Sequence, residues 1–233
     1  MRQTLNCMTY NVLHFENIRT GEIDYDAFAR VIREADADIV GLNEVYGPGS
    51  GFGDQAAQLA KRLGFAHYFS EAFLDDGVNP FGNALLSRYP IENTRTIRVP
   101  YPEVRLGPEY YEPRAVLEAD TAGLHVLVTH FGLNADEQAN ALATILPLLR
   151  EERCVLMGDF NVTPDDAVLR PIREKMCDAD AFLPAGTMSF PSDAPKKKID
   201  YVFLSRDCGV ESASVLPVVV SDHRPFRAGT VLT

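Results

Sequence analysis

Six short apolar runs in this sequence carry Asn, Asp, Glu or His at one end, and this pattern limits the folds that the chain can adopt. In the clearest case, the run Cys154-Val155-Leu156-Met157 is followed by Gly158-Asp159-Phe160-Asn161. Side chains alternate along a strand, so Asp159 and Asn161 are expected to share one side of the strand end. The six sites are Asn11, Asn43-Glu44, His130, Asp159 with Asn161, Asp200, and Asp222-His223. One such residue is usually an Asx turn, but six together predict an active site where strand ends meet loops.

The spacing of apolar residues alternates between helical and strand patterns. Helices are predicted over 24–35, 54–63, 135–150 and 164–176. Pro164 is favourable at a helix start, whereas Pro147 and Pro171 are expected to kink or break their helices. Strands are predicted over 5–10, 38–42, 66–69, 83–87, 91–99, 115–119, 124–129, 153–157, 199–204 and 210–220. A βαβα order followed by consecutive strands favours an α/β fold in which two packed mixed β-sheets are flanked by helices.

The composition is typical of one large globular domain, predicted over residues 1–233. The chain has 46% hydrophobic and 24% charged residues, and no Pro/Gly/Ser-rich linker or repeat divides it. Met1-Arg2-Gln3-Thr4-Leu5 leads directly into a predicted strand, which leaves no room for a signal peptide, and no apolar run reaches membrane-spanning length. The four cysteines lack the spacing of a metal site. We therefore expect a cytoplasmic protein with reduced thiols and no membrane span.

The charge balance bears on the partner of this protein. The chain has 22 Lys and Arg residues against 33 Asp and Glu residues, which gives a formal net charge of −11. This excess of negative charge disfavours the broad electrostatic capture that extended nucleic acid requires, so a small phosphorylated substrate is easier to accept. The obvious basic run is Lys196-Lys197-Lys198. We interpret Lys196 and Lys197 as solvated loop residues, and leave Lys198 open because it lies two residues from Asp200.

Short motifs follow one another along nearly the whole chain: Thr9-Tyr10-Asn11, Asn43-Glu44-Val45, the segment from Gly82-Asn83 to Pro90-Ile91, Thr129-His130, Gly158-Asp159-Phe160-Asn161, Ile199-Asp200-Tyr201 and Ser221-Asp222-His223. In this order they resemble the endonuclease/exonuclease/phosphatase superfamily, which includes deoxyribonuclease I. The resemblance implies a four-layer α/β sandwich that hydrolyses phosphate esters with a divalent cation, usually Mg²⁺, for which Mn²⁺ can substitute. Many relatives carry Gln at the position of Asn43, and the shorter amide changes the expected geometry around Glu44.

The resemblance and the chemistry of the side chains together suggest a metal site and a water-activating group. Glu44 is the expected metal ligand, because Mg²⁺ prefers hard oxygen atoms and commonly takes one or two carboxylates. Asn11 and Asp222 are expected to complete or steady the metal site. Asp159 is the candidate base for the attacking water, and Asn161 is expected to hold that water or a phosphate oxygen.

The remaining polar candidates are assigned to the phosphate and the leaving group. His223 is expected to donate to a nonbridging phosphate oxygen, while Asp200 fixes its tautomer and favours its cationic form. His130 is expected to stabilise developing charge or to help protonate the leaving oxygen. Asn83 and Arg114 are the predicted substrate-phosphate contacts, although strand arginines are usually solvated or ion-paired.

The leading hypothesis is a divalent-metal-dependent phosphoesterase that hydrolyses a phosphomono- or phosphodiester of a small or lipid-derived compound. The alternative within the same chemistry is an endonuclease or exonuclease acting on DNA or RNA. A third hypothesis is a noncatalytic binding module that has kept the fold. Substrate choice is expected to depend on the loops 47–53, 75–81, 100–113 and 184–198.

Overall fold

Two six-stranded mixed sheets form the centre of the computed structural model, which describes residues 3–232. Met1, Arg2 and Thr233 of the predicted domain lie outside the described residues. The first sheet has the order β13 (Gly209–Val215), β14 (Phe226–Leu232), β1 (Gln3–Asn11), β4 (Ile39–Tyr46), β6 (Asn79–Ser87) and β5 (Ala66–Asp75). The second has the order β11 (Cys177–Asp178), β12 (Asp200–Leu204), β10 (Cys154–Asp159), β9 (Leu124–His130), β8 (Ala115–Thr121) and β7 (Ile91–Arg98). A short hairpin pairs β2 (Glu16–Asn17) with β3 (Glu22–Ile23).

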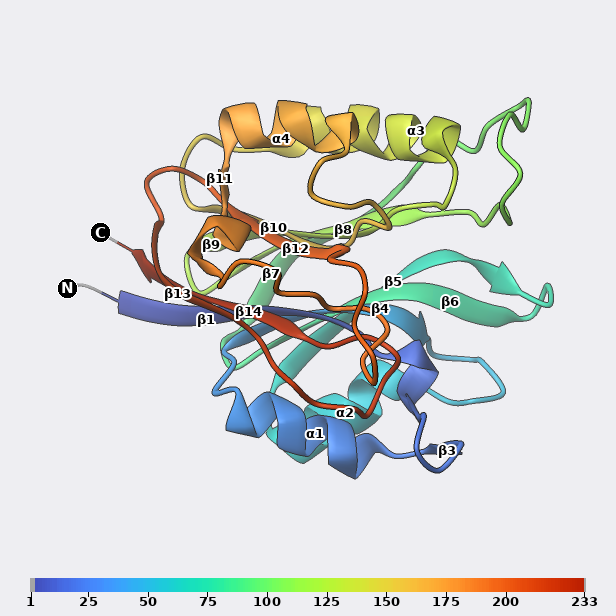
Figure 1. Ribbon diagram of the computed structural model, residues 1–233. Coiled ribbons are helices and arrows are strands. Elements are labelled where there is room, and N and C mark those ends of the chain that lie inside the picture. The colour runs from blue at the N-terminus through green and yellow to red at the C-terminus, as the bar shows by residue number, and fades with distance from the viewer. Residues whose placement is uncertain (1–2, 233) are drawn as a thin grey trace.

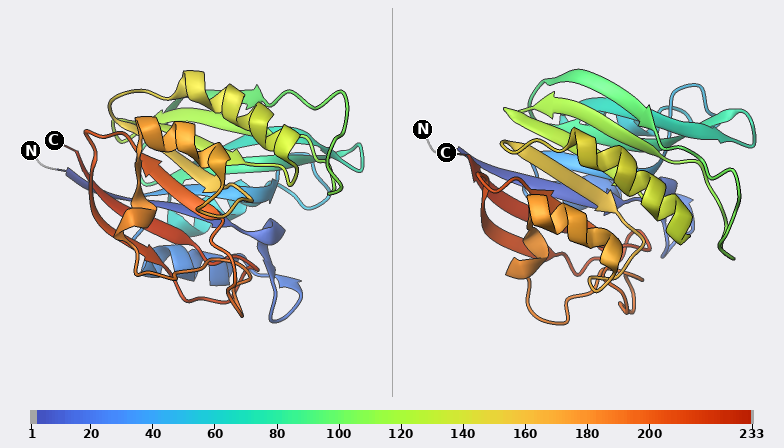
Figure 2. Two further views of the ribbon diagram at one scale, coloured as in Figure 1. Left: turned by 45° about the horizontal axis from the view of Figure 1, so that its top comes forward. Right: turned by 90° about the horizontal axis from the view of Figure 1, so that it is seen from above.

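Helices cover the outer face of each sheet and complete the predicted four-layer α/β sandwich (Figure 1). The first sheet is covered by α1 (Tyr25–Glu34) and α2 (Gln55–Leu63), and the second by α3 (Ala135–Ile145) and α4 (Arg170–Lys175) (Figure 2). Asp24 and Asp54 cap the first two helices by accepting backbone N–H groups, and Gly64 ends α2 in the left-handed conformation. Within residues 3–232, no helix is both long and apolar enough to cross a membrane.

Three apolar clusters hold these layers together, as expected when each strand has two buried faces. The cluster between the sheets includes Leu5, Ile39, Val126, Val155 and Val202. A second cluster packs the first sheet against α1 and α2, and the third packs the second sheet against α3 and α4. Tyr10, Phe160 and Tyr201 are fully buried in the two outer clusters, as expected for core aromatics.

Each sheet contains one parallel pair at its centre, and these pairs position the strand ends. β1 runs parallel to β4, with Asn11 opposite Asn43, and β9 runs parallel to β10, with His130 opposite Asp159. Gly158 permits the second pairing, because it has a φ of 153° and a Cβ atom there would lie 1.8 Å from the Thr129 carbonyl oxygen. The polar ends of β1, β4, β9 and β10 therefore meet on one side of the sandwich.

The structure corrects several predicted boundaries near the C-terminal half of the chain. The predicted strand over 210–220 ends at Val215, and Ser221-Asp222-His223 lies in the irregular segment before β14. The strand β14 was not predicted from the sequence. The helix predicted over 164–176 is a 3₁₀ turn at Ala167–Leu169 followed by α4, in which Pro171 occupies the first turn. Proline is tolerated there because the first helical N–H groups have no partner within the helix. Near Pro147, α3 gives way to a 3₁₀ turn.

Candidate active site

A β-bulge in β4 aims two consecutive polar side chains at the site. The register between β4 and β6 shifts between Leu42 and Val45, so Asn43 and Glu44 together occupy one step of the ladder. Glu44 adopts a left-handed backbone conformation with a φ of 60°. Adjacent residues of a regular strand point to opposite faces, and the bulge is what allows both side chains to serve the same region.

Asn43 links the two sheets beside Asp159. Its amide nitrogen donates to Asn83 Oδ1 over 2.8 Å and to the Thr129 carbonyl oxygen over 2.9 Å, while its oxygen accepts from the Asp159 backbone N–H over 2.9 Å. The side chain is fully buried. Asn43 therefore fixes the position of Asp159 from the opposite sheet. The sequence indicated only that an amide stands next to Glu44, not that it binds the backbone of Asp159.

Asp159 lies where the other polar groups converge. Its Oδ2 accepts from Asn11 Nδ2 over 3.2 Å and lies 3.5 Å from Nε2 of both His130 and His223, while its Oδ1 accepts from the Asn161 backbone N–H. The carboxylate is 1% exposed. Burial raises the pKa of Asp159, and the nearby Asp200 carboxylate adds to the rise. A carboxylate with a raised pKa is a stronger base for a water proton than an ordinary one.

His223 is held between two carboxylates. Its Nδ1 lies 3.1 and 3.0 Å from the two oxygens of Asp200, and its Nε2 faces Asp159. Burial opposes the charged form, but the carboxylates of Asp200 and Asp159 prevail and raise the pKa of His223. The imidazole is therefore a cation at neutral pH, with its Nδ1–H donated to Asp200.

His130 differs from His223 in charge state. Burial, the Arg114 guanidinium and the charge on His223 hold the pKa of His130 well below its usual range. Arg114 Nη1 lies 3.0 Å from Nδ1 of His130. Because a guanidinium can only donate, Nδ1 accepts from Arg114, while Nε2 lies 3.5 Å from Asp159 Oδ2 and 3.3 Å from Asn161 Nδ2. The site thus pairs a neutral histidine with a cationic one across the same carboxylate.

Glu44 and Asn11 provide the part of the site that suits a metal ion. Asn11 Nδ2 donates to Glu44 Oε1 over 2.8 Å and to Asp159, so the two carboxylates flank one amide nitrogen. Glu44 is partly exposed, and so is Asp222, whose Oδ1 accepts from Ser221 Oγ over 3.1 Å. Accessible carboxylate oxygens are the donors that Mg²⁺ and Mn²⁺ prefer. The residues present therefore fit a hard divalent cation at Glu44, with Asn11 steadying the carboxylate through its nitrogen.

A second cluster has the geometry of a metal site. Ligand atoms of Asp159, Asp200 and His223 lie within 4.8 Å of one another. Nδ1 of His223 faces Asp200 and its Nε2 faces Asp159, so the three side chains also form an ion-paired triad.

The two predicted substrate contacts, Asn83 and Arg114, each contact another polar residue of the site. Asn83 is 2% exposed, accepts from Asn43 and donates to the Ala115 carbonyl oxygen, so it supports Asn43. Its contact with a substrate phosphate stays a prediction. Arg114 lies beside His130, as a site residue should, but it also forms an ion pair with Glu112. The remaining predicted residues gather at the same side of the sandwich: Asn11, Glu44, His130, Asp159, Asn161, Asp200, Asp222 and His223.

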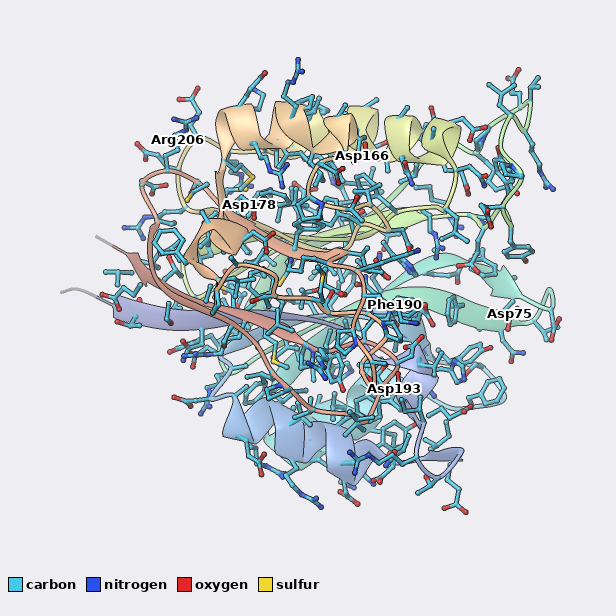
Figure 3. All side chains as sticks on the ribbon, in the orientation of Figure 1. Asp75, Asp166, Asp178, Phe190, Asp193 and Arg206 are labelled. Atoms are coloured by element: carbon cyan, nitrogen blue, oxygen red, sulfur yellow. The ribbon has the colours of Figure 1, made fainter. Side chains whose placement is uncertain are left out.

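Phe190 lies in the loop 184–198, on which substrate choice is expected to depend, and it contacts the site. Its ring lies 4.7 Å from the His223 imidazole, measured between centroids, and Figure 3 shows it in front of the strand ends, between the levels of the two sheets. Phe190 lies in a long irregular segment between the last helical turn and β12. The contact between Phe190 and His223 depends on how this irregular segment folds back on the site, which the local pattern of apolar residues does not predict.

The four-layer sandwich with its polar strand ends is the architecture of a phosphoester-hydrolysing class of proteins. A sequence model of the endonuclease/exonuclease/phosphatase family matches residues 8–223, and the chain belongs to this family, which has phosphatase and nuclease members. An uncharacterized protein of Escherichia coli strain K12, YbhP, is 29% identical over 160 residues, which cover 63% of this chain and 61% of that protein.

Two solved structures show the same fold. An endonuclease/exonuclease/phosphatase from Beutenbergia cavernae DSM 12333 has a TM-score of 0.80 and 24% identity, over 99% of this chain and 72% of that chain. The mannosyl-6-phosphatase of Bacteroides thetaiotaomicron VPI-5482 has a TM-score of 0.77 and 17% identity, over 98% of this chain and 100% of that chain. At these identities the similarity concerns the fold, and the substrate of this chain has to be argued from its own residues.

Proposed function

We propose that residues 1–233 act as one catalytic domain, a divalent-metal-dependent phosphoesterase that hydrolyses a phosphomono- or phosphodiester of a small or lipid-derived compound. The observation that carries this proposal is the convergence of Asn11, His130 and His223 on one buried oxygen of Asp159. Two basic groups and one amide around a single carboxylate form a site for moving a proton beside an anionic substrate. The net charge of −11 favours a small substrate over extended nucleic acid.

Each residue has a role that follows from its charge state. Asp159, whose pKa is raised by burial, takes the proton of the attacking water, and Asn161 orients that water. The cationic His223 donates to a nonbridging phosphate oxygen, with Asp200 holding its ring. The neutral His130 donates from Nε2 toward developing negative charge, and Arg114 fixes its tautomer.

The metal ion would be held at Glu44, with Asp222 as a further carboxylate and Asn11 positioning Glu44. When bound, a divalent cation supplies Lewis-acid stabilisation of phosphate charge. The remaining work falls to the protein groups described above, which bind the phosphate and move the proton.

The proposal is tested with a panel of phosphomono- and phosphodiesters in the presence of Mg²⁺ or Mn²⁺, comparing wild type with Asp159→Asn. We expect hydrolysis of at least one ester that stops in chelator. Removal of a general base typically costs about 10²–10⁴-fold in rate, and we expect a loss of this size in Asp159→Asn. Glu92→Gln is the matched control, because Glu92 is an exposed acid on β7.

Metal binding is measured separately by calorimetry with Mn²⁺, in wild type and in Glu44→Gln. We expect binding in the wild type and a large loss in the variant, with the thermal unfolding midpoint recorded to exclude misfolding. Wild type that binds no divalent cation and hydrolyses no ester would support the noncatalytic binding module instead. Full activity of Asp159→Asn would overturn the assignment of the base.

A further inference from the structure

A second β-bulge lies beside the proposed active site, in the ribbon formed by residues 189–198. The Phe190 carbonyl oxygen accepts from the backbone N–H groups of both Lys196 and Lys197, over 2.7 and 2.8 Å, and the Phe190 N–H donates to the Lys197 carbonyl oxygen over 2.9 Å. Two residues on one arm of the ribbon thus face one residue on the other, which defines a bulge. Bulges of this kind redirect side chains next to active sites.

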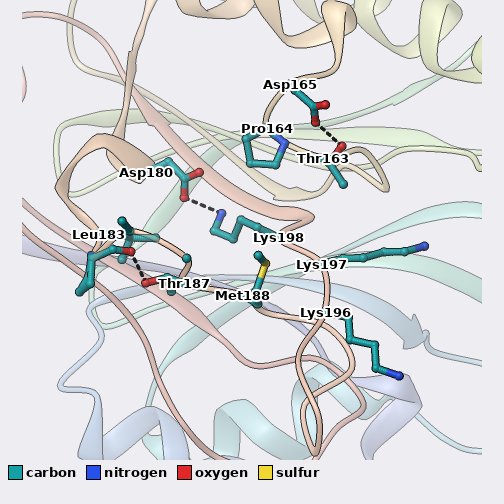
Figure 4. A pocket seen from close by; sticks show the side chains of 13 residues that line it. Thr163, Pro164, Asp165, Asp180, Leu183, Thr187, Met188, Lys196, Lys197 and Lys198 are labelled. Atoms are coloured by element: carbon teal, nitrogen blue, oxygen red, sulfur yellow. Dashed lines mark hydrogen bonds and ion pairs between the residues drawn. The ribbon is translucent and has the colours of Figure 1, made fainter.

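The bulge separates the three consecutive lysines. Lys198 is buried and forms an ion pair with Asp180 over 2.8 Å, so its charge is compensated. Lys196 and Lys197 are exposed, and both side chains point away from Lys198 (Figure 4). Within residues 3–232, neither of them forms an ion pair with a carboxylate. In a regular strand, adjacent lysines would lie on opposite faces, whereas here two uncompensated cations share one side.

The ribbon is anchored to the segment that carries the catalytic histidine. Phe190, which is paired with Lys197, packs on the His223 ring. Ser192 donates from its backbone N–H to the Asp222 carbonyl oxygen and from its Oγ to the Ser221 carbonyl oxygen, each over 2.6 Å. These bonds fix the ribbon against the site. The two lysines therefore lie at its edge, within one side-chain length of the residue that covers His223.

We propose that Lys196 and Lys197 bind a second phosphate group of the substrate, so that the enzyme selects small compounds that carry two phosphates. The inference rests on the proposed function, since the catalytic groups define where the first phosphate binds. Lys197 is paired with Phe190, whose ring lies 4.7 Å from the His223 imidazole, so the lysines flank the place proposed for the first phosphate. On a chain of net charge −11, two adjacent free cations at this place favour an anion.

The test compares kcat/KM for a hexose 6-phosphate and the corresponding hexose 1,6-bisphosphate, in wild type, in Lys196→Ala/Lys197→Ala and in Lys196→Arg/Lys197→Arg. A charge-assisted contact is worth about 10- to 100-fold in affinity. We expect the alanine pair to lower kcat/KM for the bisphosphate by about that factor, to change the monophosphate value by less than about threefold, and to be largely rescued by the arginine pair. The matched control is Lys61→Ala, an exposed lysine on α2.

Equal losses on both hexose phosphates, or no loss on either, would overturn the inference. Preferential loss on a single-stranded oligonucleotide would assign the lysines to nucleic acid and overturn the small-substrate class. Binding of propane-1,3-diphosphonate and propylphosphonate is measured in parallel by calorimetry with Mn²⁺. If no ester is hydrolysed, the proposed function fails, but a diphosphonate preference that disappears in the alanine pair still supports the second anion site, and an unchanged preference refutes it.

Discussion

Replacement of Asn43 by alanine is expected to destabilise the protein strongly, although Asn43 is a small polar residue. Its side chain makes three hydrogen bonds, which reach Asn83, the Thr129 carbonyl oxygen and the Asp159 backbone N–H. All three partners are buried, and Asn43 itself is 0% exposed. Alanine would leave two acceptors and one donor in an apolar layer without their partner.

The magnitude follows from the cost of these orphaned groups. A buried polar group left without a hydrogen bond costs about 1–3 kcal/mol. Asn83 keeps its bond to the Ala115 carbonyl oxygen, so the three losses are not independent, and we expect a total near 4 kcal/mol. For a chain of this length, that corresponds to a decrease in the unfolding midpoint of roughly 8–16 °C. Activity should also fall, because the Asp159 backbone loses its bond to Asn43.

The free energy of unfolding is measured by urea titration in chelator, with thermal unfolding as a second measurement. Asn43→Asp separates the bond to the Asp159 N–H from the other two bonds of Asn43. It keeps an acceptor for that N–H but places a carboxylate against Asn83 Oδ1 and the Thr129 carbonyl oxygen, so this variant should be at least as unstable as Asn43→Ala. Asn140→Ala is the control, because the side chain of Asn140, on α3, makes one hydrogen bond, to the Pro100 carbonyl oxygen. A loss below about 1 kcal/mol in Asn43→Ala would refute the reasoning.

Three further outcomes are expected. Lys198→Ala leaves the partly buried Asp180 without its cation, so it should cost about 2–4 kcal/mol in urea titration, and the added change Asp180→Ala should recover part of this loss. Asp24→Ala removes the helix cap that accepts the Ala27 N–H and should cost about 1 kcal/mol, whereas Asp24→Asn should cost less. Burial opposes the charge on His223, but neighbouring carboxylates raise its pKa to about 10. The native state therefore binds more protons than the unfolded state above pH about 6.5, so in chelator the unfolding free energy should fall as pH rises from there to about 10. Asp200→Asn should flatten this slope, and an unchanged slope would contradict the assignment.

The strand ends could be predicted from sequence because their signal is local. An apolar run followed by Asp159 or His130 reports both a buried strand and a polar group at its end. Parallel pairing then brings the two groups together, since the carboxyl ends of parallel strands share one sheet edge. The helices capped by Asp24 and Asp54 were predictable for the same reason, because a capping side chain precedes the helix that it stabilises.

The features that local patterns could not report arise from pairing between distant segments. Val218–Val220 has the composition of a strand but remains irregular, whereas Phe226–Leu232 pairs with β1, which no local pattern distinguishes. The bulge at Glu44 exists only because β6 supplies one residue fewer than β4. The hydrogen bonds of Asn83 could not be predicted for a similar reason, since its partners Asn43 and Ala115 lie on other strands.

The bulge in β4 and the bulge at Phe190 have different roles in the proposed site. The bulge in β4 belongs to a strand that is buried except at Glu44, and it holds Glu44 beside Asn11, which also donates to Asp159 of the second sheet. The bulge at Phe190 belongs to a surface ribbon, and its lysines Lys196 and Lys197 are exposed. A change in the first disturbs the core and the proposed chemistry together, whereas a change in the second alters charge at the edge of the site at little cost in stability. Substrate preference in a protein of this design can therefore vary through the ribbon while the reaction stays the same, which is why the lysine pair, and not the strand ends, should decide between one phosphate and two.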